Sequence, residues 1–329
     1  MHMPIALDYR SISSQTICEE AEKLWLQVDI VSKENNLFYI SSPTKKILFK
    51  STDFGGNSAL WYKIADNKEI TGILLSRHNI ATPKSVTISA LQYDKNSLDK
   101  QTQGLSFPLV AKPIDEAHGN GVMMSIDSTQ ELKSVLDKLL GSYDSIIIQE
   151  QIQGDEVRVL VVRWQVILAK NRIPAHIVGD GTHTIQDLIA KKNDNPIRGK
   201  WYDKPLAEID IDAKLHRFLK KQGLDIDAIP DKWTYIQLRG TSNLWTGGSM
   251  QDVTDTLCDD IKDTCIHVAD IFWLDICGID IISPDISVPF EKNGWVILEV
   301  NATPSIAWDR ELSNTNSAKK TLELLFFSS

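Results

Sequence analysis

The chain has 329 residues, a length that suggests about two domains at the usual ~150 residues per domain. Hydrophobic residues make up 42% and charged residues 24%, which is typical of a globular chain and excludes collagenous or wholly disordered classes. A formal net charge of −9 leaves no global positive field, so a nucleic-acid partner is not expected. The four cysteines form no CxxC pair, which predicts reduced, buried thiols.

The N-terminal residues 1–8 lack a basic segment followed by an apolar core, and no run of about 18 apolar residues occurs in the sequence. We therefore expect no membrane partner and a cytoplasmic location.

The first 65 residues predict a short N-terminal lobe of βαβ type, with a helix over 12–28 and extended runs at 36–40 and 46–50. A glycine-bearing loop at 55–58 ends this lobe. Helical spacing of apolar residues then predicts a helix over 67–78, and Pro83 begins the next extended segment.

The middle of the chain predicts an antiparallel sheet packed by helices. A short apolar strand at 107–113 leads into a glycine-bearing loop, and Ser128 with Glu131 forms the capping box of a helix that ends at Gly141. Strands are predicted at 145–152, 156–162 and 166–169. Further on we expect helices at 184–192, 215–222 and 255–274, and strands at 234–238, 278–282 and 295–301.

Three oxygen-bearing side chains lie on the last two predicted strands. Asp280 alternates with apolar residues, and Glu299 and Asn301 stand two apart, so that they share one face with Leu298 and Val300 opposite. If the two strands pair antiparallel, these side chains converge into an all-oxygen set suited to Mg²⁺. The alternative is a stray polar residue beside a solvent-facing strand edge.

Lys112 ends the strand 107–113 and is followed by His118, Gly119, Asn120 and Gly121. A lysine beside a glycine loop suits a phosphate, because backbone N–H groups can close over the anion while the ammonium neutralises it. The alternative is a snorkelling lysine beside a flexible hairpin.

Glu156 and Arg158 lie two apart on one strand, which suits a ribose diol and an anionic group. The alternative is a charged strand face in contact with solvent only.

Taken in order, these motifs resemble the ATP-grasp superfamily of carboxylate-amine ligases and, more narrowly, the ATP-grasp region of the cyanophycin synthetases. The resemblance runs from about residue 65 to 309 over separate stretches, at 107–113 with 118–122, 173–181, 238–248, 278–280 and 298–304. It implies an α+β ATP-grasp fold: a pre-ATP-grasp lobe at 1–65 and an ATP-grasp domain at 66–329. That domain would have a lid subdomain at about 83–150 and a C-terminal metal-binding subdomain at about 151–329.

The resemblance also implies roles for individual residues. Asp280, Glu299 and Asn301 would bind two Mg²⁺ ions, with Mn²⁺ as a substitute. Residues implied to face the reacting carboxylate or transferred phosphate are Arg239, Asn243 and Arg158. Residues implied to bind ATP are Lys68 and Lys112 with the loop His118, Gly119, Asn120 and Gly121 at the phosphates, Gln149, Glu150, Gln151 and Ile152 at the adenine, and Glu156 at the ribose.

The activity implied is ATP-dependent formation of an amide bond between a carboxylate, of an amino acid or short peptide, and an amine, with release of ADP and phosphate. A homodimer is a further expectation of the resemblance. No stretch resembles the Mur-ligase-like half of the cyanophycin synthetases, so polymer synthesis by this chain alone is not expected. The alternatives are an ATP-grasp kinase and a non-catalytic nucleotide-binding module.

Overall fold

The computed structural model describes residues 11–114, 121–200 and 204–328 of the chain. These residues divide into two compact units, which are described separately. Unit 1 holds the described residues up to Thr82, Val157–Lys170 and the described residues from Asp252 onward. Unit 2 holds the described residues of Pro83–Glu156 and Asn171–Gln251. This partition differs from the predicted domain limits, since residues 171–251 group with the predicted lid.

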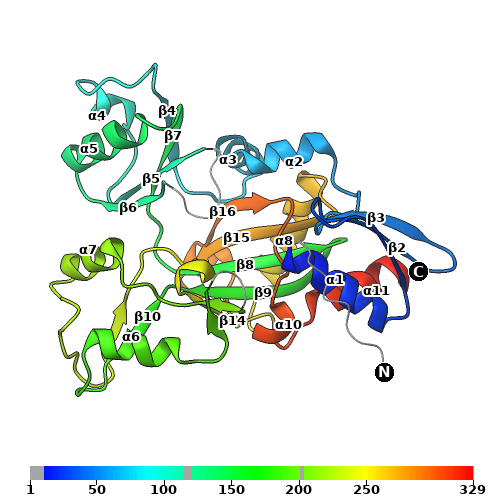
Figure 1. The fold of residues 1–329 in the computed structure, drawn as a ribbon. Helices are drawn as coiled ribbons and strands as arrows, with labels where there is room; N and C mark the ends of the chain where they lie inside the picture. Colours follow the sequence, from blue (N-terminus) through cyan, green and yellow to red (C-terminus); the bar gives the residue numbers. More distant parts are fainter. Residues whose placement is uncertain (1–10, 115–120, 201–203, 329) are drawn as a thin grey trace. The chain divides into compact units, whose positions relative to one another are not determined.

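A mixed set of helices and strands, drawn in Figure 1, confirms the α+β class. The first half of the chain contains α1 (Ile12–Lys23), β1 (Gln27–Ser32), β2 (Leu37–Ser41), β3 (Lys46–Lys50), α2 (Ala59–Asp66), α3 (Lys68–Arg77), β4 (Ser85–Ser89), α4 (Leu98–Gln101), β5 (Leu109–Pro113), β6 (Met123–Ile126), α5 (Thr129–Leu139), β7 (Ser145–Glu150) and β8 (Asp155–Val162). The second half contains β9 (Gln165–Ile173), β10 (His176–Val178), α6 (Ile185–Asn193), β11 (Arg198–Gly199), β12 (Leu206–Ala207), α7 (Ala213–Lys221), β13 (Tyr235–Gln237), η1 (Leu244–Thr246), β14 (Ser249–Asp252), α8 (Asp259–Ile271), β15 (Ile276–Ser283), α9 (Phe290–Asn293), β16 (Val296–Asn301), α10 (Asp309–Leu312) and α11 (Ser317–Phe326).

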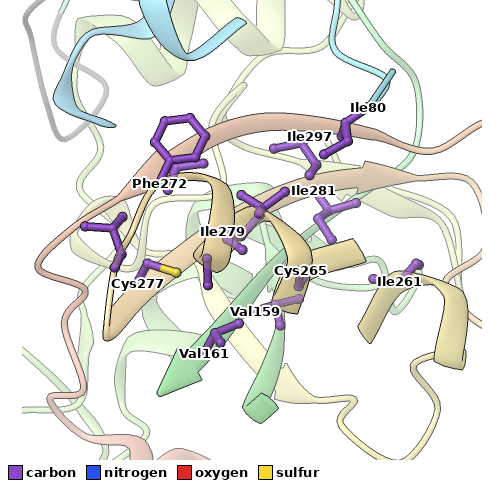
Figure 2. Close-up of a cluster of buried hydrophobic side chains, with 14 of the residues drawn as sticks. Ile80, Val159, Val161, Ile261, Cys265, Phe272, Cys277, Ile279, Ile281 and Ile297 are labelled. Carbon is purple, nitrogen blue, oxygen red and sulfur yellow. The ribbon is translucent and has the colours of Figure 1, made fainter. Parts of the chain in front are cut away.

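The central sheet has the strand order β14-β9-β8-β15-β16 and is covered on both faces. Successive residues of a strand point to opposite faces, and β8 shows this directly. Val157, Val159 and Val161 join a core with α8, whereas Leu160 and Val162 join a second core with α1 and α11. Figure 2 shows the first of these cores, and Figure 1 shows α1 and α11 lying side by side.

The N-terminal region corrects one prediction. The expected βαβ lobe is a helix followed by a purely antiparallel sheet in the order β1-β2-β3, and the predicted helix ends at Lys23, so that Val28 lies in β1. Consecutive strands joined by short turns pair antiparallel more readily than strands that need a crossover.

The predicted lid contains a four-stranded antiparallel sheet in the order β4-β7-β5-β6, with α4 and α5 packed on one face. The Ser128 hydroxyl caps α5 by accepting a hydrogen bond from the Glu131 backbone N–H at 3.2 Å, as predicted. The carboxylate of Glu131 accepts from the Asp127 backbone N–H rather than from Ser128, so the box is closed one residue further out.

All four cysteines are free thiols, as predicted, and three are buried; the prediction of burial is wrong for Cys258, which is only partly buried. Burial raises the pKa of Cys277 to about 12, so this thiol stays protonated. Among the described helices, none combines the length and the apolar character needed to cross a bilayer.

Candidate active site

The predicted pairing of the last two site strands is confirmed. β15 and β16 run antiparallel, with Asp280 directly opposite Glu299 and Gly278 opposite Asn301. Opposed residues of an antiparallel pair point to the same face, so Asp280, Glu299 and Asn301 converge. These three residues are called the oxygen triad below.

A β-bulge in β16 changes which of its residues point to each face of the sheet. The register passes from Asp280–Glu299 to Ile281–Ile297, which leaves Leu298 as the extra residue. Ile297 and Val300 therefore both enter the core with α8, while Leu298 does not. The predicted placement of Leu298 beside Val300 is wrong for this reason, and that of Glu299 and Asn301 is unaffected.

Arg158 lies on β8, the strand next to β15, and pairs with the carboxylates of the triad. Its guanidinium makes a bidentate ion pair with Asp280, with Nη2 at 2.6 Å from Oδ2, and Nη2 lies 3.6 Å from Glu299 Oε1. Both Arg158 (8% exposed) and Asp280 (2% exposed) are buried, so each offsets the desolvation of the other.

Gly278 makes this close approach feasible. A Cβ atom at this position would lie 2.9 Å from Arg158 Cδ and 2.9 Å from Pro304 Cβ, closer than real contacts allow. The arginine therefore packs directly on the backbone of β15.

The triad fits a hard divalent cation. It offers two carboxylates and one amide, and the Asn301 amide donates its N–H to Glu299 Oε1 at 3.1 Å, which leaves Oδ1 as the oxygen for a cation. The described residues contain no group of three or more His, Cys, Asp or Glu side chains suited to a metal, and the triad itself contributes two carboxylates and an amide. Mg²⁺ uses few protein carboxylates and completes its shell with water and phosphate oxygens.

The other predicted residue of unit 1 is Lys68. It is the first residue of α3, whose N-cap Asn67 accepts a hydrogen bond from the Ile70 backbone N–H at 3.0 Å. The cap fixes where the helix begins and so where Lys68 lies.

Unit 2 brings Lys112 and Gln149 to one sheet face. Lys112 pairs with Ile147 and Val110 pairs with Gln149 in the β5–β7 ladder. These residues alternate with the core residues Ala111 and Ile148, so they occupy the face opposite α5. Both polar side chains are buried on that face.

Side chains of the predicted adenine hinge, residues 149–152, bond to the backbone of neighbouring segments. Glu150 Oε1 accepts from the Ser106 backbone N–H at 2.9 Å, and Gln151 Oε1 accepts from the Ser125 backbone N–H at 2.7 Å. The Gln151 backbone N–H donates to the Pro108 carbonyl at 2.9 Å. Ile152 follows in the connection to β8.

Only the last residue of the predicted phosphate loop is described. His118, Gly119 and Asn120 lie outside the described residues. Gly121 has φ +68°, and a Cβ there would lie 2.8 Å from Pro113 Cγ, so this position requires glycine.

Glu156 Oε1 receives a hydrogen bond from Arg172 Nη1 at 3.0 Å. The arginine fixes the orientation of a carboxylate for which the sequence predicted ribose binding. This pairing across β8 and β9 was not predicted.

Arg239 is buried and pairs with a residue that the sequence analysis missed. Nη1 lies 2.7 Å from Asp212 Oδ1, Nη2 donates to the Asp210 carbonyl at 2.8 Å, and Nε is buried with no partner among the described residues. Asp212 also caps α7 by accepting from the Leu215 backbone N–H at 2.8 Å. Burial is the largest single influence on the pKa of Asp212 and would raise it. The hydrogen bonds from Arg239 and from the Leu215 and Lys214 backbone N–H groups, together with the positive charge of Arg239, outweigh burial, so the pKa lies below its ordinary value.

Asn243 begins the short η1 helix, and its Oδ1 accepts from the Trp245 backbone N–H at 2.9 Å.

The cap signal of Asp212 is readable in the sequence, as an aspartate before a helical run. Its pairing with an arginine 27 positions later is not.

The fold and these motifs define the class of protein. The chain belongs to the RimK-like ATP-grasp domain family, whose profile matches residues 65–178 and 238–325. This confirms the resemblance to the ATP-grasp superfamily and the ATP-grasp fold.

Two similar proteins and one solved structure give the comparison detail. The chain is 33% identical over 325 residues to a cyanophycin synthetase of Crocosphaera subtropica, covering 95% of this chain and 36% of that protein. It is 30% identical over 311 residues to the glutathione biosynthesis bifunctional protein GshAB of Listeria monocytogenes, covering 92% of this chain and 39% of that protein. The chain thus spans little more than a third of the length of these relatives.

The solved structure is a bifunctional glutathione synthetase from Pasteurella multocida, with a TM-score of 0.73 and 24% identity over 98% of this chain and 45% of that chain. This likeness supports the fold.

Proposed function

We propose that the chain is an ATP-dependent ligase that joins a carboxylate, of an amino acid or short peptide, to an amine through an acyl phosphate. The observation that carries this proposal is the oxygen triad on one face of β15 and β16 in a chain of the RimK-like ATP-grasp family. The names of the relatives, a cyanophycin synthetase and a glutathione biosynthesis protein, support a small amino acid or peptide substrate. A cytoplasmic location and a homodimer stay predictions of the sequence.

The reaction has two balanced steps. A substrate carboxylate oxygen attacks the γ-phosphorus of ATP, the bond to the bridging oxygen breaks, and ADP leaves. The amine nitrogen then attacks the acyl carbon, the carbon–oxygen bond to phosphate breaks, and the amine loses a proton as inorganic phosphate departs. Mg²⁺ held by the oxygen triad would neutralise charge on the phosphoryl group during the first step.

The described residues support this chemistry by position and charge. Arg158 pairs with Asp280 and lies near Glu299, so that its charge offsets that of the two carboxylates in a buried setting. Lys68 and Lys112 would hold the ATP phosphates together with the loop that ends at Gly121. Gln149–Ile152 would hold adenine and Glu156 the ribose.

Arg239 would hold the substrate carboxylate or the transferred phosphate, with Asn243 beside it in the sequence. The buried Nε without a partner supports this role, because such a donor gains a hydrogen bond when an anion arrives.

A coupled assay of ADP and phosphate release tests the proposal, using Mg²⁺ and ATP over a pairwise matrix of amino acids, short acidic peptides and amines. We expect both products only when a carboxylate and an amine are present together. Glu299→Ala should abolish turnover. Glu291→Ala, which changes an exposed residue of α9 in the same unit, should not. ADP without free phosphate would indicate the kinase instead, and near-normal turnover of Glu299→Ala would refute the metal assignment.

A further inference from the structure

The loop at residues 55–58 supplies a side chain that joins the ends of the two triad strands. Asn57 Nδ2 donates to the carbonyl of Ile276 at 2.9 Å and to the carbonyl of Ala302 at 2.7 Å. Its Oδ1 accepts a third hydrogen bond from the Ile276 backbone N–H at 3.3 Å. The carboxamide therefore makes the bonds that a peptide unit makes inside a sheet ladder.

The two bonded backbone positions belong to the end of the hairpin that carries the triad. Ile276 begins β15, and Ala302 directly follows Asn301, the last residue of β16. The outermost register pair is Gly278 with Asn301, so Asn57 acts just beyond the last rung of the ladder. It fixes the peptide unit between Ala302 and Thr303, one residue beyond Asn301.

The loop that presents Asn57 is itself held in place. Asp53 Oδ1 accepts from the Gly55 backbone N–H at 2.8 Å, and Ser58 Oγ accepts from the Trp61 backbone N–H at 3.2 Å where α2 begins. Between them, a Cβ on Gly56 would overlap the Asp275 carboxylate, so the loop backbone runs directly against the residue before β15. Asn57 is thus fixed on both sides.

We propose that Asn57 is a positioning residue, which sets the separation of β15 and β16 at the triad and thereby the fit of the triad around a divalent cation. Metal ligands depend on the groups that orient them, and loss of such a group typically weakens metal binding about 10–100-fold. The inference rests on the metal role of the triad in the proposed function. It concerns a loop that lies outside the matched family segments, which begin at residue 65.

The test measures Mn²⁺ binding to the full chain by electron paramagnetic resonance of free Mn²⁺, with a non-hydrolysable ATP analogue present. Asn57→Ala removes all three bonds, and Asn57→Asp keeps the size of the side chain but turns a carboxylate toward two carbonyl oxygens. We expect each variant to bind Mn²⁺ about 10-fold more weakly than the parent. Using both variants protects the test against a folding failure in one, and circular dichroism verifies the fold.

Asn193→Ala is the matched control. Asn193 is also half-buried, donates to the Ile209 carbonyl at 3.1 Å and accepts from the Ile209 backbone N–H at 2.9 Å, but it lies in unit 2. The Asn193→Ala variant loses side-chain-to-backbone hydrogen bonds of the same kind as those of Asn57, but it leaves β15 and β16 unchanged. Its Mn²⁺ affinity should therefore stay at the parent value. An equal loss in the Asn57 and Asn193 variants would overturn the positioning role.

Glu299→Gln separates this inference from the proposed function. If Mn²⁺ binding survives in Glu299→Gln, the metal assignment is wrong and the proposed function fails with it. If Glu299→Gln loses Mn²⁺ while the Asn57 variants bind at the parent affinity, the proposed function stands and the positioning role of Asn57 is refuted.

Discussion

Two exposed tryptophans occupy helix ends whose backbone geometry favours glycine. Trp25 (φ 59°) follows the C-cap of α1 and Trp273 (φ 47°) follows the C-cap of α8. At the end of α1, the Leu26 backbone N–H donates to the Ala21 carbonyl at 2.9 Å and that of Trp25 to the Glu22 carbonyl at 3.1 Å. This is the bonding of a Schellman motif, whose left-handed residue is usually glycine.

The same pattern closes α8. The Leu274 backbone N–H donates to the Ala269 carbonyl at 3.0 Å and that of Trp273 to the Asp270 carbonyl at 3.0 Å. Burial of these two side chains offsets little of the backbone strain, because Trp25 is 94% and Trp273 is 71% exposed. A left-handed L-residue costs roughly 1–2 kcal/mol, and glycine loses part of this advantage through its greater freedom in the unfolded chain.

We therefore expect Trp25→Gly and Trp273→Gly each to raise the free energy of unfolding by about 1 kcal/mol. The two sites lie on separate helices, so the double variant should gain about 2 kcal/mol. Urea unfolding followed by far-ultraviolet circular dichroism measures the change. It should appear as a higher midpoint at an unchanged slope.

Trp25→Ala is the control that isolates the backbone. It removes the exposed ring but keeps a Cβ at the left-handed position, so it should leave stability near the parent value. Equal gains from alanine and glycine would assign the effect to the exposed ring, and a loss of stability in Trp25→Gly would refute the reasoning. Trp295→Gly should instead cost about 3–5 kcal/mol, because Trp295 is 3% exposed and packs in the core of unit 1.

Three further variants test ion pairs and packing within the two units. Lys170→Met should lower the free energy of unfolding in urea by about 3–5 kcal/mol, because Asp309, which lies 2.7 Å from the Lys170 ammonium, becomes a buried charge without its partner. A change in the unfolding midpoint that lies within experimental error would contradict this. Gly278→Ala should lower the free energy of unfolding by about 1–3 kcal/mol and should also lower ADP release, because the new Cβ would lie 2.9 Å from Arg158 Cδ. Turnover equal to that of the parent would show that Arg158 can move without loss of activity. Because the folded pKa of Asp212 lies below its unfolded value, its stabilising contribution is present above the unfolded pKa and is lost as the pH falls through the folded one. The Asp212→Asn variant should therefore lose less stability in acid than the parent when the free energy of unfolding is measured against pH. If the two proteins lose stability identically at low pH, Asp212 does not contribute to the acid dependence.

Local patterns in the sequence predicted the elements that short-range forces determine. The capped helix that begins after Ser128 and the antiparallel pair that brings Asp280 opposite Glu299 both follow from spacing and strand alternation. The bulge at Leu298 escaped prediction because an extra residue in one strand leaves no mark on an alternating sequence. The N-terminal region was misassigned because short apolar runs reveal strands but not their pairing direction.

The candidate site depends on contacts that no sequence period encodes. Arg158 meets Asp280 across 122 positions, and Asn57 meets Ala302 across 245. A motif search recovers the proposed ligand side chains because their spacing within a strand is regular. It misses Asn57 because that residue acts through two backbone carbonyls, which every residue type provides. On our proposal, the loop that carries Asn57 helps to set the separation of β15 and β16 although it contains no recognisable chemical motif. A cation site with fixed bond lengths depends on that separation, so a change in metal affinity on loss of Asn57 is the measurement that tests the role.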